Sequence, residues 1–264
     1  MFPFIEIFPG TFLYAFGVAL SLSFFAFLWN LKKLAKRFWY SFSFFSHNII
    51  WFFISVFIFS RAFYVIGRWS DMKFIKDPFQ FFIMSEYNFS LFWAIFWFSL
   101  VLAILTRLER WSINRYIDGV VLSFLFVLVI GYIGAFFGGQ VYGRETAFGI
   151  EIIYKNPFTP VPYQVPVFPL PIVYMLVSFL IFCSMYILSL FVHIRGYIGY
   201  CGLLLFSAMI LILEFFSGKH DILSIYSVFN LPQIYALILA LWSGYQLFHI
   251  FKQDTKNTEN HIES

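Results

Sequence analysis

Residues Gly131 to Arg144 read GYIGAFFGGQVYGR, and the interpretation of the whole chain starts from this stretch. It places five glycines within fourteen residues, at the end of an apolar run that is long enough to cross a membrane. A helix that only crossed lipid would not need them, because glycine loosens a helix and lets another backbone or a ligand headgroup approach closely. The stretch therefore indicates a functional site at the end of a membrane span.

The composition of the 264 residues places this site in a membrane. Hydrophobic residues make up 61% of the chain, charged residues make up 11%, and the mean hydropathy is +0.83. A soluble protein of this length could not hide so much apolar surface from water. We therefore predict an all-α integral membrane protein.

Seven apolar runs approach the roughly 20 residues that span a bilayer, which predicts a seven-transmembrane-helix bundle. The runs cover residues 10–30, 43–66, 88–106, 119–139, 171–193, 199–216 and 231–251. Six prolines between positions 157 and 171 exclude a helix there, so residues 144–170 are expected to form one longer extracytoplasmic loop. Residues 1–251 would then form a single membrane domain, and the polar residues 252–264 a disordered cytoplasmic tail.

Basic residues predict the orientation of these spans. If the seven runs alternate in direction, ten of the 17 Lys and Arg residues fall on one side, six fall on the other, and Arg61 lies within a span. The ten are Lys32, Lys33, Lys36, Arg37, Arg107, Arg110, Arg115, Arg195, Lys252 and Lys256. Because cytoplasmic loops are enriched in Lys and Arg, the N-terminus is expected outside and the C-terminus inside. The net charge of +4 fits contact with anionic lipid, and no nucleic-acid partner is expected.

Charge inside the membrane is the main candidate for chemistry. The sequence has no phosphate-binding glycine loop, no Gly-x-Ser-x-Gly motif and no paired histidines, so neither a soluble-enzyme motif nor a metal site is expected. Arg61 and Glu214 lie within apolar runs, where a charge is costly unless it is paired or faces a cavity. They could form an ion pair that fixes helix register, or they could take part in binding a lipid headgroup. Arg61 and Arg144 are the candidates for holding a phosphate, because a guanidinium is permanently charged and can donate two parallel hydrogen bonds.

The glycine-rich stretch resembles the signature of the prolipoprotein diacylglyceryl transferases, Gly-Arg-x-Gly-Asn-Phe-x-Asn/Gly-Gly-Glu-x-Tyr/Trp-Gly. The residues in register with it are Gly131, Gly134, Phe136, Gly138, Gly139, Tyr142 and Gly143, which Arg144 follows. Other segments resemble the family in the same order along most of the chain. They are Arg61 to Val65, Asp77 with Pro78, Asp118, Val165 and Pro166 with Pro169, Glu214 to Phe216, and Leu231 to Gln233.

The resemblance implies a seven-span protein of the bacterial cytoplasmic (inner) membrane that acts in lipoprotein biosynthesis. Members of the family move a diacylglyceryl group from phosphatidylglycerol to the lipobox cysteine of a lipoprotein precursor, and no metal or organic cofactor is implied. The expected partners are therefore phosphatidylglycerol or another anionic phospholipid, and a lipoprotein precursor peptide. The lipid-binding candidates are Arg61, Gly134, Gly138, Gly139, Tyr142, Gly143 and Arg144.

At several polar positions this chain departs from the family pattern. Tyr132 stands where the signature has arginine, Ala135 where it has asparagine, and Gln140 where it has glutamate. Phe92 stands at the family's third-span histidine, Ile210 at an arginine four residues before Glu214, and Phe16 at a first-span tyrosine.

These departures leave two main hypotheses open. In the first, a rebuilt catalytic site uses neutral hydrogen bonds in place of charge-assisted ones, and its candidate residues are Arg61, Tyr132, Gln140, Arg144 and Glu214. In the second, the protein is a catalytically inactive relative that binds phospholipid or lipoprotein precursors. An unrelated role such as transport would predict internal repeats or paired broken helices, and neither is visible in the sequence.

Overall fold

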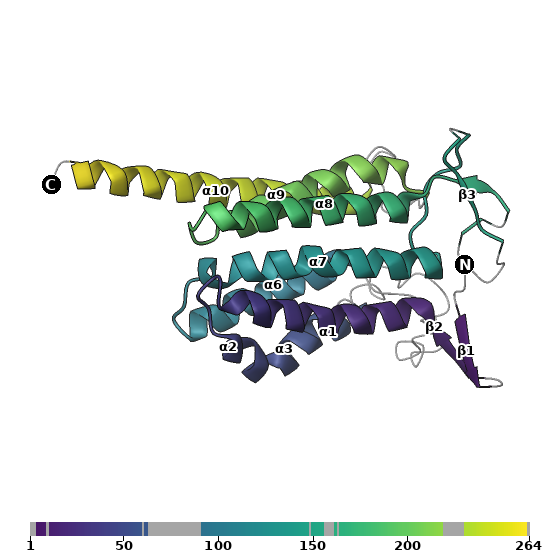
Figure 1. Ribbon diagram of the computed structural model, residues 1–264, viewed down its shortest axis with the longest axis horizontal. Coiled ribbons are helices and arrows are strands. Elements are labelled where there is room, and N and C mark those ends of the chain that lie inside the picture. The colour runs from purple at the N-terminus through teal and green to yellow at the C-terminus, as the bar shows by residue number, and fades with distance from the viewer. Residues whose placement is uncertain are drawn as a thin grey trace. The chain divides into compact units, whose positions relative to one another are not determined.

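The computed structural model describes residues 4–8, 11–59, 61–62, 91–147, 149–155, 161–162, 164–218 and 230–262 of the chain. Its contacts divide the chain into two compact units. The first unit comprises residues 1–38 and 116–264, and the second comprises residues 39–115. Figure 1 labels most of the helices and strands along the chain.

Six helices in the described part of the chain are long and apolar enough to cross a membrane. They are α1 (Ala15–Ala35), α6 (Leu91–Leu108), α7 (Asn114–Gly138), α8 (Leu170–Phe191), α9 (Tyr197–Leu213) with the 3₁₀ turn η3 (Glu214–Phe216), and α10 (Leu231–Ile262). Each of them overlaps one of the spans predicted from the sequence. The protein is therefore a mostly helical membrane protein, and the predicted all-α membrane class is confirmed.

The second predicted span, residues 43–66, is not confirmed, and neither is the predicted number of seven spans. Its described part consists of the short helices α2 (Phe42–His47) and α3 (Ile49–Phe53), followed by the π-helix η1 (Ile54–Phe59). Residues 60 and 63–66 lie outside the described residues. The interruption at Asn48 has a local cause, because its side-chain amide donates to the backbone oxygen of Phe44 at 2.9 Å and competes with regular helix geometry.

The second unit is packed largely through aromatic rings. The rings of Phe52 and Phe98 lie 4.9 Å apart, and those of Phe59 and Trp97 are stacked at 4.5 Å, so both contacts join the α3–η1 segment to α6. Near the ends of the unit, the Nε of Arg115 donates to the backbone oxygen of Trp39 at 3.2 Å. Aromatic pairs of this kind add stability beyond the area that they bury.

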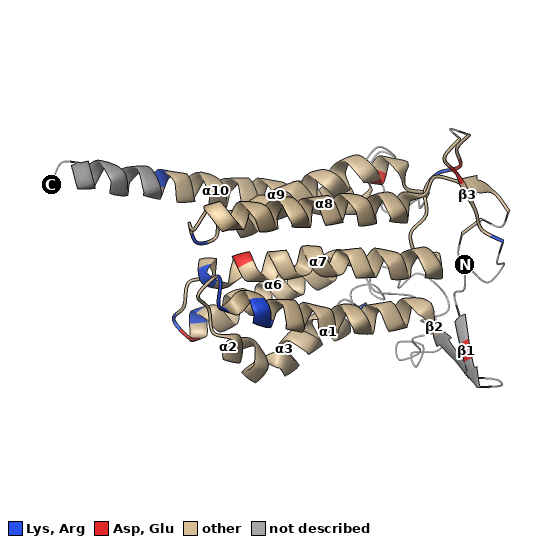
Figure 2. Ribbon diagram, viewed as in Figure 1, with Lys and Arg blue, Asp and Glu red and all other residues tan. Residues whose placement is uncertain are grey.

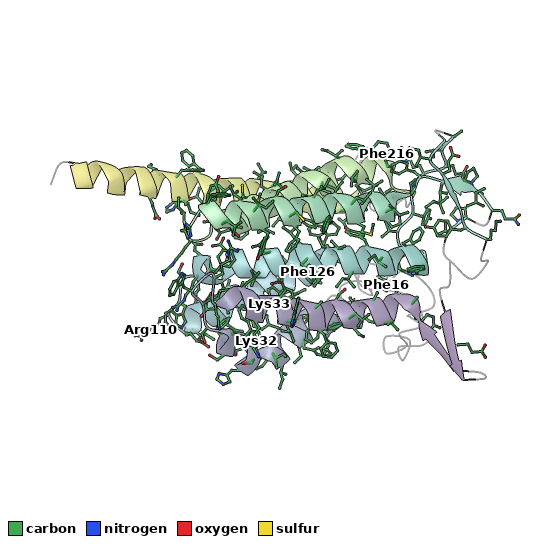
Figure 3. All side chains as sticks on the ribbon, viewed as in Figure 1. Phe16, Lys32, Lys33, Arg110, Phe126 and Phe216 are labelled. Atoms are coloured by element: carbon green, nitrogen blue, oxygen red, sulfur yellow. The ribbon has the colours of Figure 1, made fainter. Side chains whose placement is uncertain are left out.

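In the first unit, α7 packs against α1 through small residues. A Cβ atom added to Gly134 would clash with the Cβ of Ala19, and one added to Gly138 would lie 3.2 Å from the Cβ of Phe16. Figure 3 labels Phe16, near the start of α1. Glycine at these positions therefore permits the close approach of two membrane helices.

The opposite face of α7 packs against α9. A Cβ atom added to Gly199 would lie 2.8 Å from the backbone carbon of Ile117, so the two helix backbones touch at this point. Here the carboxylate of Asp118 accepts hydrogen bonds from the backbone N–H groups of Gly196 and Gly199, at 2.7 and 2.6 Å. Asp118 is only 3% exposed. It therefore caps the first turn of α9 from a different helix, because the leading N–H groups of a helix have no partner within it.

The connection between α7 and α8 contains two short strands, β3 (Ile152–Ile153) and β4 (Pro166–Val167), which pair antiparallel. Its buried cluster of Tyr154, Val161 and Val167 is surrounded by Tyr142, Ile152 and Val165. Burial raises the pKa of Tyr154 to about 12. We call residues 142–169 the head; its predicted extracytoplasmic position stays a prediction.

The secondary structure near both ends of the chain differs from the elements predicted from the sequence. The strands β1 (Phe4–Phe8) and β2 (Thr11–Tyr14) form an antiparallel hairpin before α1, where the sequence predicted a span from residue 10. Aromatic and β-branched residues favour strands as much as they favour membranes. At the other end, α10 continues to Ile262 through polar residues predicted to be a disordered tail, since adding residues to an existing helix costs little.

Candidate functional site

A stacked pair of tyrosines and a glutamate lie together inside the first unit. The rings of Tyr132 in α7 and Tyr174 in α8 are stacked, with centroids 4.8 Å apart and planes 7° from parallel. The hydroxyl of Tyr174 donates to Oε2 of Glu214 at 3.0 Å. Tyr132 is 8% exposed and Tyr174 is 2% exposed. Three membrane segments thus contribute to one cluster, in which Tyr174 stacks on Tyr132 and donates a hydrogen bond to Glu214. Figure 2 shows few charged residues along the helices.

Arg144 is attached to the same turn that begins with Glu214. The backbone N–H of Arg144 donates to the oxygen of Phe216 at 2.8 Å, and its side-chain Nε donates to the oxygen of Ser217 at 3.2 Å. The Arg144 side chain is exposed. Because η3 carries Glu214 at its start and holds Arg144 at its end, a carboxylate and a guanidinium are fixed to one short turn, close to the head.

The glycine-rich end of α7 is a helix terminus of a familiar kind. Gly139 follows the last helical residue and has a φ of 66°, and the N–H of Gln140 donates to the oxygen of Ala135 at 2.9 Å. A left-handed glycine with this hydrogen bond is the Schellman arrangement, which satisfies carbonyl groups that the helix leaves open. Gln140 is 8% exposed and its side-chain amide donates to the oxygen of Gly138, so it folds back over the helix end.

Gly143 lets three segments meet directly after this terminus. Its N–H donates to the oxygen of Phe168 at 3.2 Å, and it forms a bridge with Ser217 on the other side. A Cβ atom added to Gly143 would lie 2.5 Å from that oxygen of Phe168. The N–H of Gly218 in turn donates to the oxygen of Tyr142 at 3.0 Å. The signature glycine is therefore needed for close backbone packing between the head and the end of α9.

The structure places most of the residues predicted for the site in two neighbouring groups. Tyr132 and Glu214 are bridged by Tyr174, while Gln140, Tyr142, Gly143 and Arg144 line the connection from α7 into the head. The contacts of Gly134 and Gly138 are with α1 and indicate helix packing, so lipid binding by these glycines stays a prediction. Arg61 belongs to the second unit, where it is 4% exposed. Its role and its suggested ion pair with Glu214 also stay predictions.

Sequence analysis missed two residues that complete this arrangement. Tyr174 lies in the middle of an apolar run, and a tyrosine there is also common as a lipid-facing or interfacial residue, so its partner Glu214 could not be inferred. Ser217 contributes its backbone oxygen, an interaction that no residue type can signal. A polar hydroxyl within a span was the one available clue to Tyr174, because a buried phenol needs a hydrogen-bond partner.

Substitution of Gly134 tests whether the signature glycines set the α1–α7 contact. We expect Gly134→Ala to lower the free energy of unfolding by about 1–3 kcal/mol, because overpacking a helix contact forces backbone shifts. Gly131→Ala is the matched control, since a Cβ atom there meets nothing within 4 Å. Thermal unfolding of both purified variants in the same detergent would compare them. Equal melting temperatures for the two variants would contradict a packing role for Gly134.

The pattern of one protein family, the prolipoprotein diacylglyceryl transferases, matches residues 4–249, which is nearly the whole chain. The chain belongs to this family. Three phosphatidylglycerol–prolipoprotein diacylglyceryl transferases from strains of Dehalococcoides mccartyi are similar to it, one with 30% identity and two with 29% over 112 residues. Each alignment covers 42% of this chain and 42% of the relative, so less than half the length of each relative is matched.

Two residues of the Tyr132–Tyr174–Glu214 cluster lie in segments that resemble the diacylglyceryl transferase family pattern. Tyr132 lies in the glycine-rich signature and Glu214 in the segment that resembles the end of the family's sixth span. Tyr174 therefore joins two segments that resemble the family, by stacking on Tyr132 and by donating a hydrogen bond to Glu214.

Proposed function

We propose that this protein transfers a diacylglyceryl group from phosphatidylglycerol to the cysteine of a lipoprotein precursor, in the inner membrane of a bacterium. The observation that carries the proposal is the attachment of Arg144 to the turn that Glu214 begins, which offers an anion-binding group and a proton acceptor on one element. The proposal is also supported by the names of the curated relatives, which specify phosphatidylglycerol and prolipoprotein. The protein lies with its N-terminus outside and its C-terminus in the cytoplasm.

The reaction exchanges one bond for another. The cysteine sulfur attacks the glyceryl carbon that carries the phosphate, a sulfur–carbon bond forms, and the bond from that carbon to the phosphate oxygen breaks. Glycerol phosphate leaves with the electron pair of the broken bond, and the thiol proton passes to a base. A free cysteine thiol has a pKa of about 8.5, so help with its deprotonation accelerates the attack at neutral pH.

Glu214 is the base in this proposal. Tyr174 donates to one of its carboxylate oxygens and so fixes the orientation of the other, and stacking on Tyr132 holds the Tyr174 ring in place. General bases must be positioned within hydrogen-bond reach of the proton that they remove. Tyr174 is therefore a positioning residue, and Tyr132 supports it through the ring contact.

Arg144 holds the phosphate. Its Nε is engaged by the oxygen of Ser217, and among the described residues no hydrogen bond involves its two terminal NH₂ groups. A guanidinium anchored in this way can direct those groups at the phosphate oxygens, where negative charge grows as the carbon–oxygen bond breaks.

Removal of Arg144 tests this proposal. We expect Arg144→Ala to lower the rate of diacylglyceryl transfer by about 10-fold to 100-fold, the effect of losing hydrogen bonds between charged groups. The rate is read as the gain in mass of a lipobox peptide incubated with the purified protein and phosphatidylglycerol. Lys155→Ala is the matched control, because Lys155 is an exposed basic residue of the same head.

Two results of that assay would count against the proposal. If Arg144→Ala and Lys155→Ala were both as active as the unchanged protein, Arg144 would not hold the phosphate. If the unchanged protein gave no gain in peptide mass while an active family member did under the same conditions, transfer by this protein would be excluded.

A second candidate function is binding of phospholipid or lipoprotein precursors without catalysis. It is favoured by Tyr132 and Ile210, which are 8% and 2% exposed. By the resemblance described from the sequence, both stand at positions where the family pattern has arginine. Neither side chain can carry the permanent charge that holds a phosphate. This function predicts saturable binding of the lipobox peptide to the purified protein without any gain in peptide mass.

A further inference from the structure

The head contains a small sheet whose outer strand is β3. Val167 of β4 pairs with Ile152 of β3 on one side and with Glu145 on the other, so β4 lies between β3 and residues 143–146. On their far side, residues 143–146 meet Ser217. Figure 1 shows β3 beyond the end of α7 and the start of α8. Among the residues that the structure describes, β3 therefore forms one edge of the sheet.

The hydrogen bonds of β4 alternate between its two neighbours. The N–H of Phe168 and the oxygen of Pro166 bond to residues 144 and 146, on the side away from β3. Successive residues of an antiparallel strand turn their backbone groups to opposite sides. Val167, between these two residues, therefore turns its own groups toward Ile152, with which it pairs. Ile152 is thus the residue of β3 that β4 engages.

The residues on either side of Ile152 direct their backbone groups outward, by the same alternation. Among the described residues, the N–H and oxygen groups of Glu151 and Ile153 have no hydrogen-bond partner. The neighbouring side chains are apolar and exposed, since Ile150 is 68% and Ile153 is 50% exposed. Edge strands are usually protected by a charge or a proline, but both residues of β3 are isoleucine. The edge is therefore open to pairing.

An open edge favours one kind of occupant over others. Hydrocarbon offers no hydrogen-bond partner to free N–H and C=O groups, so insertion of β3 into the lipid core is unfavourable. An extended peptide satisfies both groups by adding a strand, as peptides do at other exposed sheet edges. The exposed Ile153 side chain then lies beside the peptide side chain opposite it, a contact that favours β-branched and aromatic residues. The edge thus fits an extended chain.

We propose that β3 binds the segment of the lipoprotein precursor that follows its cysteine, as an added strand of the head sheet. This inference rests on the proposed function, in which the cysteine reacts beside Arg144. Neighbouring strands lie about 4.8 Å apart, so the added strand lies about 14 Å from residues 143–146. An extended chain covers this distance with about four or five residues. The residues before the cysteine belong to the apolar signal segment, so those after it are the ones that reach β3.

Backbone N-methylation of the peptide tests this docking without changing the protein. The probe is a fluorescent lipobox peptide that continues about ten residues beyond its cysteine, and its binding to the purified protein is read by anisotropy in detergent without phosphatidylglycerol. Two isomers carry N-methyl groups on alternate residues of this segment. We expect one isomer to bind about tenfold more weakly and the other within about twofold of the unmodified peptide, because only every second N–H faces β3. Equal affinity of the two isomers would overturn the proposal.

A substitution in β3 makes the corresponding change in the protein. Ile153→Pro removes the outward N–H at an edge position, where proline is tolerated. We expect it to weaken binding of the long peptide about threefold to tenfold, and to leave binding of a peptide that ends directly after the cysteine unchanged. Ile153→Val is the matched control, because it keeps the N–H and the β-branched shape. Binding of the long peptide to Ile153→Pro within twofold of the unchanged protein would also overturn the proposal.

The outcomes separate this docking from the transfer reaction. In the transfer assay, Ile153→Pro should raise the KM for the long peptide and leave kcat unchanged. A difference in affinity between the two isomers without any gain in peptide mass would refute transfer and support the docking. Equal affinities together with a gain in mass would refute the docking alone. A change from dimer to monomer in Ile153→Pro, with equal binding of both isomers, would instead assign the edge to contact between two copies of this chain.

Discussion

Glu214→Gln is expected to abolish most of the diacylglyceryl transfer while the fold stays intact. Glutamine has nearly the size of glutamate and its carbonyl can still accept the hydrogen bond from Tyr174, which is 3.0 Å long in the unchanged protein. It cannot take up the thiol proton, and the loss of a general base typically lowers rates by about 100-fold to 10,000-fold. Single-turnover transfer to a lipobox peptide in phosphatidylglycerol vesicles would measure the effect.

A matched variant and a graded variant sharpen this experiment. Glu145→Gln removes an exposed carboxylate from the head and should leave the rate unchanged. Tyr174→Phe keeps the ring stack on Tyr132 but removes the hydrogen bond to Glu214, so we expect an intermediate loss of about tenfold. A lower rate with an unchanged apparent affinity for lipid would identify Tyr174 as a positioning residue. Transfer by Glu214→Gln within threefold of the unchanged protein would eliminate Glu214 as the base.

The membrane spans could be predicted because hydrophobicity is a property of each residue and needs no tertiary information. Six of the seven predicted runs overlap helices that are long and apolar enough to cross a membrane, among the residues that the structure describes. Local interactions within otherwise apolar sequence explain the two places where the structure differs from the predicted spans. Asn48 turns its amide back onto Phe44 and interrupts the second run, and the residues of β1 and β2 favour extended structure as much as they favour lipid.

The site was less predictable than the spans, because it depends on contacts between distant segments. The glycine-rich stretch indicated a special backbone, and the structure places Gly139 in a left-handed turn and Gly143 against Phe168. The sequence could not show that Tyr174 would join Tyr132 to Glu214, since the hydrogen-bonded pair is 40 residues apart. It also could not distinguish Gly134, which packs against Ala19, from a glycine that faces a ligand.

Asp118→Ala is expected to cause the largest loss of stability among single substitutions in the first unit that keep the signature stretch intact. The carboxylate of Asp118 accepts two short hydrogen bonds from the start of α9, where Gly196 has a φ of 87° and Gly199 touches the backbone of α7. Alanine would leave both N–H groups buried and unsatisfied, at a cost of about 1–3 kcal/mol each. We expect the free energy of unfolding to fall by about 2–5 kcal/mol, measured by denaturant titration in detergent.

The comparison with Asp118→Asn and Ser207→Ala separates the cap from the general effect of losing a buried polar group. Asparagine keeps one acceptor oxygen, so it should retain about half of the stabilisation. Ser207 is equally buried, but its hydroxyl donates only to Leu203 of its own helix, so Ser207→Ala should cost less than about 1 kcal/mol. If Asp118→Ala cost no more than Ser207→Ala, the junction of α7 and α9 would depend on the contact at Gly199 alone. A large cost for Asp118→Ala, with asparagine between the two, would instead establish that one carboxylate holds α9 to α7 across 78 residues of sequence.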